Sequence, residues 1–233
     1  MKLAPFLASQ WRPALGCTEP ACVAWAAANA ASLAAGEIES IRLVCDPGLF
    51  KNCYAVGIPF SGRKVGILWA LAIGARLPDP SLGLECFRAA TPAILAAAGE
   101  LIDAGRVQVE IVAGRAGLFV DCVVTRAGGT GRAVIEEEHT RLTRLERDGT
   151  VESLPAAASE QEQAFDRAEL GRLSLADVLA AARLLDGAER QALRRGLAMN
   201  RAIAEHGLGL LPRDFAAAPA DVPQARAARL VCG

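Results

Sequence analysis

The chain has 233 residues, of which 52% are hydrophobic, 22% charged and 5% aromatic, and its formal net charge is -1. A chain of this length buries most of its apolar surface on folding, so it needs neither disulfides nor a metal merely to fold. The hydrophobic content excludes a disordered protein, and the balanced charge gives no basic field for phosphates. We therefore expect a globular protein without a nucleic-acid partner.

Export and membrane insertion are not expected. No apolar run reaches the roughly 18 to 20 uncharged residues of a membrane-spanning helix, because the longest, 21–35, stops at Gly36 and Glu37. The first eleven residues hold one lysine and no apolar core with a small-residue cleavage site, unlike a secretion signal. The expected location is the cytoplasm, with no membrane partner.

The amino-terminal part predicts a short helix, a polar segment at 16–20 and an alanine-rich helix that ends near Ala35. Thr18 can cap the second helix, and Pro20 falls in its first turn, where a missing N–H is no loss. Alternating apolar residues then predict a strand over 38–45, which an Asp-Pro-Gly sequence ends.

The central part changes from helical to strand patterning. Residues 50–66 read as a loop punctuated by glycines, followed by a helix from about Lys64 to Arg76. A helix with Thr91 as its cap is expected to end at Ala104, with a glycine just beyond. A period of two then predicts four short antiparallel strands, at 107–111, 118–124, 133–135 and 142–145.

The strand pattern ends after Asp148-Gly149, and the rest of the chain reads as helical. Residues 154–159 resemble a linker, and Ser174 with Asp177 forms a helix start of cap and acid. Helices are expected at 174–185, 188–206 and 219–231.

These elements predict an α+β fold, in which alanine-rich helices surround a small antiparallel sheet and a helical carboxy-terminal segment follows. We expect residues 1–150 to form the α+β domain and residues 151–233 to form the helical segment, the incomplete start of the rest of a catalytic domain. No internal repeat is visible.

Seven cysteines in a chain without an export signal are expected to be reduced, and an odd number cannot pair fully. No two are spaced as Cys-x-x-Cys, which argues against a zinc ribbon or a thioredoxin-type site. Cys45, Cys86 and Cys122 lie among apolar neighbours and are expected in the core.

Cys17 stands immediately before a predicted helix, where the positive end of the helix dipole favours a thiolate. A thiolate there can be a nucleophile or an iron ligand. On its own, however, the pattern is better explained by a buried small residue beside a helix cap. Glu19 is equally ambiguous, since acids in a first helical turn are common for electrostatic reasons alone.

Four segments, in order, carry a family resemblance: PALGCTEP at 13–20, KNCYAVGIP at 51–59, EHT at 138–140 and LERDG at 145–149. Together they resemble the L-cysteine desulfidase family, which is related to the alpha component of the iron–sulfur L-serine dehydratases. The resemblance runs from about residue 12 to residue 149 and continues more weakly through the helical segment.

The resemblance implies a [4Fe–4S] lyase without pyridoxal phosphate, which converts a small β-substituted L-amino acid to pyruvate, ammonia and a leaving group. Cys17 matches the first cluster ligand. A cluster held by three thiolates leaves one iron open as a Lewis acid. The family's other ligands lie beyond the end of this chain and Cys232 matches none of them, so this polypeptide alone is not expected to hold an intact cluster.

The 51–63 segment is a candidate substrate-binding loop, because glycine-rich backbone before a helix suits a carboxylate. Lys51 would add positive charge, and Asn52 would supply hydrogen bonds. The other candidate substrate-binding residues are Thr18, Ser61 and Gly62. The alternative is an ordinary tight turn. Cys53, where the family tolerates small residues, is expected to pack.

Glu19 and His139 are the candidate catalytic residues. His139 can carry a proton near neutral pH, although an exposed turn histidine is the more frequent explanation of such a residue.

Three functions follow. The first is an L-cysteine desulfidase that releases pyruvate, ammonia and hydrogen sulfide. The second is an L-serine dehydratase of the same fold, and the third is a catalytically silent module that binds a small amino acid without a cluster. Closely packed alanine-rich faces are compatible with a homo-oligomer.

Overall fold

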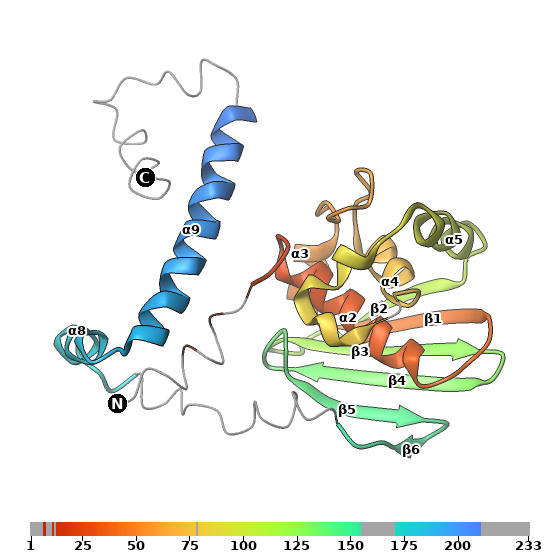
Figure 1. Cartoon of the computed structure of the whole chain (residues 1–233). Helices are drawn as coiled ribbons and strands as arrows, with labels where there is room; N and C mark the ends of the chain where they lie inside the picture. The colour runs from red at the N-terminus through yellow and green to blue at the C-terminus, as the bar shows by residue number, and fades with distance from the viewer. Residues whose placement is uncertain (1–6, 8–10, 12, 78, 155–170, 211–233) are drawn as a thin grey trace. The chain divides into compact units, whose positions relative to one another are not determined.

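The computed structural model describes residues 7, 11, 13–77, 79–154 and 171–210 (Figure 1). The chain divides into two compact units, one of residues 13–163 and the other of residues 1–12 with 164–233. Apart from Cys232, every candidate site residue falls in the 13–163 unit. The predicted division at residue 150 stays a prediction.

Six strands form one mixed sheet in the order β2-β1-β3-β4-β5-β6. Their bounds are β1 Ile38–Cys45, β2 Val107–Ile111, β3 Phe119–Arg126, β4 Gly129–Glu136, β5 Leu142–Arg147 and β6 Thr150–Val151. Together with the helices that pack on it, this sheet confirms the α+β class.

Strand β2 corrects the prediction of a wholly antiparallel sheet. It lies parallel to β1, with Ile41 opposite Val107 and Cys45 opposite Ile111, whereas all other pairings are antiparallel. The chain between β1 and β2 is a long helical crossover, which is what a parallel pairing requires. An alternating pattern marks a strand but does not give its direction, so the sequence could not separate the two pairings.

The helices of this unit gather on one face of the sheet (Figure 1). They are α2 Thr18–Ser32, α3 Pro47–Cys53, α4 Ile67–Gly74, the 3-10 helix η1 Pro80–Ala89, and α5 Pro92–Asp103. Helix α2 contacts β3 and β4 on one side and α4 and η1 on the other. It is therefore a central layer, buried at every position from Pro20 to Ala31.

Small residues allow α2 to be packed from both sides. A Cβ atom on Gly131 of β4 would lie 1.9 Å from the carbonyl oxygen of Ala30, and one on Gly74 of α4 would lie 2.4 Å from that of Ala24. The backbones of β4 and α4 therefore approach the backbone of α2 closely on its two sides. Larger side chains would not fit between them, which explains why the sequence of α2 is dominated by alanine.

The expected burial of Cys45, Cys53, Cys86 and Cys122 is confirmed, since all four are fully buried in the core. Cys22 on α2 is fully buried as well. Cys232 lies outside the described residues.

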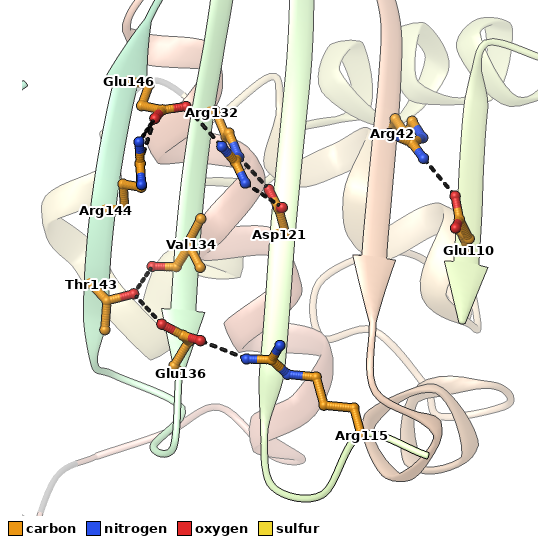
Figure 2. Close-up of polar contacts among 10 residues, drawn as sticks. All are labelled: Arg42, Glu110, Arg115, Asp121, Arg132, Val134, Glu136, Thr143, Arg144 and Glu146. Atoms are coloured by element: carbon orange, nitrogen blue, oxygen red, sulfur yellow. Dashed lines mark hydrogen bonds and ion pairs between the residues drawn. The ribbon is translucent and has the colours of Figure 1, made fainter. Parts of the chain in front are cut away.

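The other face of the sheet carries ion pairs (Figure 2). Arg132 donates to both carboxylate oxygens of Asp121 at 2.8 Å and to Glu146 at 2.9 Å, and Arg144 also pairs with Glu146. Arg42 pairs with Glu110 across β1 and β2 at 2.5 Å. The sheet is thus apolar toward the helices and charged on its opposite side.

Several predicted boundaries are confirmed. Strand β1 spans the predicted residues, and α5 begins after Thr91, whose hydroxyl accepts the Ile94 N–H. Ser174 and Asp177 form a reciprocal capping box at the start of α8 (Leu175–Arg183), and α9 (Gly187–Leu210) covers the second predicted carboxy-terminal helix.

Other predictions are wrong. The amino cap of α2 is Cys17 and not Thr18, which is already helical. The start of the supposed 50–66 loop belongs to α3, because Asp46 caps that helix by accepting the Leu49 N–H at 2.9 Å. The strand pattern also continues past Gly149 into β6, a pair of exposed residues too short to show periodicity.

In the second unit, α8 buries none of its residues, and Trp11 packs on α9, where its indole N–H donates to the Ala192 carbonyl at 3.3 Å. Of the predicted amino-terminal helix, only residue 7 and residue 11 are described, and the linker beyond Leu154 and the 219–231 helix fall outside the described residues. Across the described parts of the chain, no helix combines the length and apolarity needed to cross a bilayer.

Candidate functional site

The candidate site starts at the amino end of α2. Cys17 is the amino cap, with φ of -62° and ψ of 131°, and Glu19 lies in the first helical turn. Cys17 is exposed, so the alternative of a buried small residue is wrong. The unpaired N–H groups of a first turn favour a negative side chain such as Glu19 there.

Helix α3 brings Asn52 to this point. Asp46 fixes the helix, since one carboxylate oxygen accepts the Leu49 N–H and the other accepts the Phe119 N–H of β3, both at 2.9 Å. One turn later, the Asn52 side-chain amide donates to Glu19 Oε1 at 2.9 Å. A residue 33 positions away in the sequence therefore orients the Glu19 carboxylate.

The connection between β4 and β5 supplies His139. Its Nε2 atom lies 3.9 Å from Glu19 Oε1. This nitrogen is buried and has no hydrogen-bond partner among the described residues. His139 therefore lies half-buried in a turn beside Glu19, and its catalytic role stays a prediction.

The second oxygen of Glu19 holds the Cys17 thiol. Cys17 Sγ donates to Glu19 Oε2 at 2.8 Å, and the Thr18 hydroxyl donates to the same oxygen at 3.3 Å. Partial burial and this contact with Glu19 raise the pKa of the Cys17 thiol above its ordinary value. Burial and the adjacent carboxylate thus both oppose a thiolate at Cys17, which is contrary to the expectation from the helix end.

Glu19 itself stays ionised at neutral pH. Burial alone would raise its pKa, but hydrogen bonds from Cys17 and Asn52 and the proximity of His139 together hold the pKa below its ordinary value. The site thus contains a carboxylate, a protonated thiol and an imidazole around one point. Such a set can bind a cationic group or exchange a proton with a ligand.

The remaining predicted residues lie nearby or serve local structure. Lys51 is exposed next to Asn52 in the last turn of α3. Ser61 is buried, and its hydroxyl donates to the Ile58 carbonyl at 2.6 Å and accepts the Lys64 N–H at 3.0 Å. Gly62 follows with φ of +63°. Ser61 and Gly62 therefore shape a turn, and their contact with a substrate stays a prediction.

The described cysteines do not assemble around Cys17 as a ligand set. Burial raises the pKa of Cys45 to about 11 and those of Cys53 and Cys86 to about 12, so these thiols stay protonated. Within the described ranges, no three His, Cys, Asp or Glu side chains are grouped so that they could hold a metal ion.

Sequence reasoning did not single out Tyr54 and Phe60, which are 67% and 60% exposed just beyond Asn52. Two aromatic residues in a segment punctuated by Gly57 and Gly62 were the signal available for them.

No protein-family model matches the chain. A UPF0597 protein of Geobacter sulfurreducens is 40% identical over 199 residues, which are 84% of this chain and 46% of that protein. A UPF0597 protein of Clostridium botulinum is 30% identical over 207 residues, or 87% of this chain and 48% of that one. The chain spans about half the length of the curated relatives it matches. The name UPF0597 states no reaction, substrate or cofactor.

Proposed function

We propose that this chain is the amino-terminal part of an iron–sulfur-dependent lyase that converts L-cysteine and water to pyruvate, ammonia and hydrogen sulfide. One observation carries the proposal: Cys17, Glu19, Asn52 and His139 come from three separate segments and meet at the amino end of α2. The resemblance of the 13–20 motif to L-cysteine desulfidases supports the reaction class. The proposed compartment is the cytoplasm, where thiols remain reduced.

The described residues do not fit a [4Fe–4S] cluster by themselves. Such a cluster needs three or four thiolates, and Cys17 is the one exposed cysteine that the structure describes. The other five described cysteines are buried. The remaining ligands must therefore come from outside the described residues.

The chain's own residues would handle the substrate and its protons. Ionised Glu19 can hold the substrate ammonium group or accept a proton, and His139 Nε2, at 3.9 Å, is the second group that can carry one. Thr18 and Asn52 fix the carboxylate through their hydrogen bonds. Lys51 adds positive charge that a substrate carboxylate could use.

The direct test is turnover. The chain is co-expressed with the part of the Geobacter sulfurreducens relative that it does not span, reconstituted anaerobically with iron and sulfide, and assayed for sulfide and pyruvate from L-cysteine. We expect turnover that is lost in Cys17→Ala and in Glu19→Gln and kept in Glu110→Gln, a control on strand β2. Full sulfide release by Cys17→Ala would contradict the proposal. The same assay with L-serine decides whether the protein is an L-serine dehydratase instead.

A second candidate is the silent amino-acid-binding module. The ionised Glu19 carboxylate favours it, because this group can hold a substrate ammonium without any metal. This function requires that the iron-free chain bind L-cysteine or L-serine, which isothermal titration calorimetry of the chain alone tests. Heat of binding that disappears in Glu19→Gln, together with no turnover after reconstitution, would favour the module over the lyase.

A further inference from the structure

The Glu19 carboxylate is surrounded by hydrogen-bond donors. Its Oε2 atom accepts from the Cys17 thiol at 2.8 Å and from the Thr18 hydroxyl at 3.3 Å, and its Oε1 atom accepts from the Asn52 amide at 2.9 Å. A carboxylate offers about four lone-pair positions to donors. Three are taken, which leaves one on Oε1, the oxygen that lies 3.9 Å from His139 Nε2.

The two ring nitrogens of His139 have different surroundings. Nε2 is buried, and no described residue forms a hydrogen bond with it. Nδ1 also has no hydrogen-bond partner among the described residues, but it is not one of their buried polar atoms. The side chain as a whole is 34% exposed. One nitrogen of the ring therefore lies beside the carboxylate, and the other is accessible to a ligand.

The turn between β4 and β5 holds the imidazole at this place. The Glu136 N–H donates to the Arg141 carbonyl at 3.1 Å, which closes the turn, and the Glu137 N–H ties it to the Leu118 carbonyl at 3.0 Å. His139 lies within this closed turn. The 3.9 Å separation of Nε2 from the carboxylate exceeds the length of a hydrogen bond by about 1 Å, so a small movement of the ring is enough to form one.

Electrostatics decide which ring nitrogen carries the proton. A lone pair on Nε2 would be repelled by the Glu19 carboxylate, whereas an N–H there is attracted to it. A histidine that donates one N–H to a carboxylate keeps a lone pair on its other nitrogen, as in the histidine–carboxylate pairs of hydrolases. Such hydrogen bonds are often long before a ligand binds. Nδ1 is then the acceptor that stays free for a ligand.

We propose that Glu19 is the positioning residue of a carboxylate–histidine pair, in which Nε2–H of His139 points to Glu19 and Nδ1 accepts the proton that the substrate gives up. The Cα–H bond of L-cysteine breaks and its proton goes to Nδ1. The electron pair of that bond forms the Cα–Cβ double bond as the Cβ–S bond breaks, and sulfide leaves with the electrons of the C–S bond. The Glu19 carboxylate stabilises the imidazolium that results. The identity of the substrate rests on the proposed function, but the orientation of the pair does not.

The chain contains two histidines, which allows a direct test. The iron-free chain is labelled with ¹⁵N-histidine, and long-range proton–nitrogen correlation spectra at about pH 8, where histidine is ordinarily neutral, show which ring nitrogen is protonated. We expect the Nε2–H form at His139. Glu19→Ala removes the acceptor and should lower the ratio of the Nε2–H to the Nδ1–H form at His139 by about tenfold.

His206, which is exposed on α9, is the internal reference, and its ratio should not change. The matched control Glu110→Ala, on β2, should leave both histidines as they are in the wild-type chain. Amide spectra of each variant verify that the fold is kept. The Nδ1–H form at His139 in the wild-type chain would overturn the proposal, and so would a ratio that Glu19→Ala leaves unchanged.

This measurement is independent of turnover. The expected spectra together with no sulfide release after reconstitution would leave the pair standing and remove the lyase. Turnover by a chain whose His139 is in the Nδ1–H form would keep the lyase and remove this role of Glu19.

Discussion

Replacing Glu19 by glutamine should make the Cys17 thiol more reactive. The Glu19 carboxylate accepts the thiol proton at 2.8 Å, which stabilises the thiol and opposes the thiolate. Glutamine keeps the size of the side chain and removes the negative charge. The variant therefore isolates the electrostatic effect of the carboxylate on its neighbour.

The magnitude follows from two contributions. Two unit charges about 4 Å apart repel by about 1 kcal/mol in water, and the change from a charged to a neutral hydrogen-bond acceptor adds up to about 1 kcal/mol. Together, about 1 to 2 kcal/mol raises the thiolate fraction about fivefold to thirtyfold at a pH below the thiol pKa. Since nucleophilicity falls with thiol pKa, the rate of alkylation should rise less, by about twofold to sevenfold.

The assay is alkylation of Cys17 by iodoacetamide between about pH 6 and pH 8, followed by mass spectrometry of the peptide that contains it. Cys17→Ser defines the background from other cysteines, and Glu110→Gln serves as the charge-matched control. An unchanged or slower rate in Glu19→Gln would refute the assignment of the raised pKa to this carboxylate.

Three further substitutions test the fold around the site. Gly131→Ala should lower the free energy of unfolding in urea by about 3 kcal/mol, because the added Cβ meets a carbonyl of α2. The control Gly57→Ala, which has open space around it, should cost little. Equal urea midpoints for the two variants would contradict this explanation. Asp46→Ala should lower stability by about 2 kcal/mol through loss of two backbone partners, and an unchanged urea midpoint would count against that role. Arg132 holds the pKa of Glu146 low, so the pairing stabilises the fold above the ordinary glutamate pKa and is lost on acidification. Arg132→Gln should therefore lower the urea midpoint at pH 7, with a difference from wild type that shrinks below about pH 4; a constant difference would be inconsistent with this linkage.

Local patterning predicted most of the elements. Strand β1 and the capped start of α5 followed from short-range rules, namely alternation and a threonine before a proline. The helix formed by 47–53 was missed because its amino cap, Asp46, lies in a sequence that also fits a turn. Strand direction in β2 was missed because it depends on the crossover path.

In the candidate site, too, local sequence motifs were predictable and tertiary contacts were not. Cys17 and Glu19 were identified from neighbouring residues in one motif. Their mutual hydrogen bond depends on side-chain orientation, and burial together with this bond raises the thiol pKa that the helix end was expected to lower. Asn52 and His139 were singled out separately, and nothing in the sequence placed both beside Glu19. Tertiary packing brings them together, and one sequence without its fold does not contain those distances.

The burial of α2 on all sides has a thermodynamic consequence for any ligand at its amino end. The backbone that carries Cys17 and Glu19 continues into a helix clamped between the sheet and two further helices. A ligand there would need to order only side-chain rotamers, since the backbone has already lost its conformational entropy during folding. Amides of α2 beyond its first turn should accordingly exchange with deuterium only through global unfolding, which makes the helix that carries the site one of the slowest-exchanging parts of the molecule.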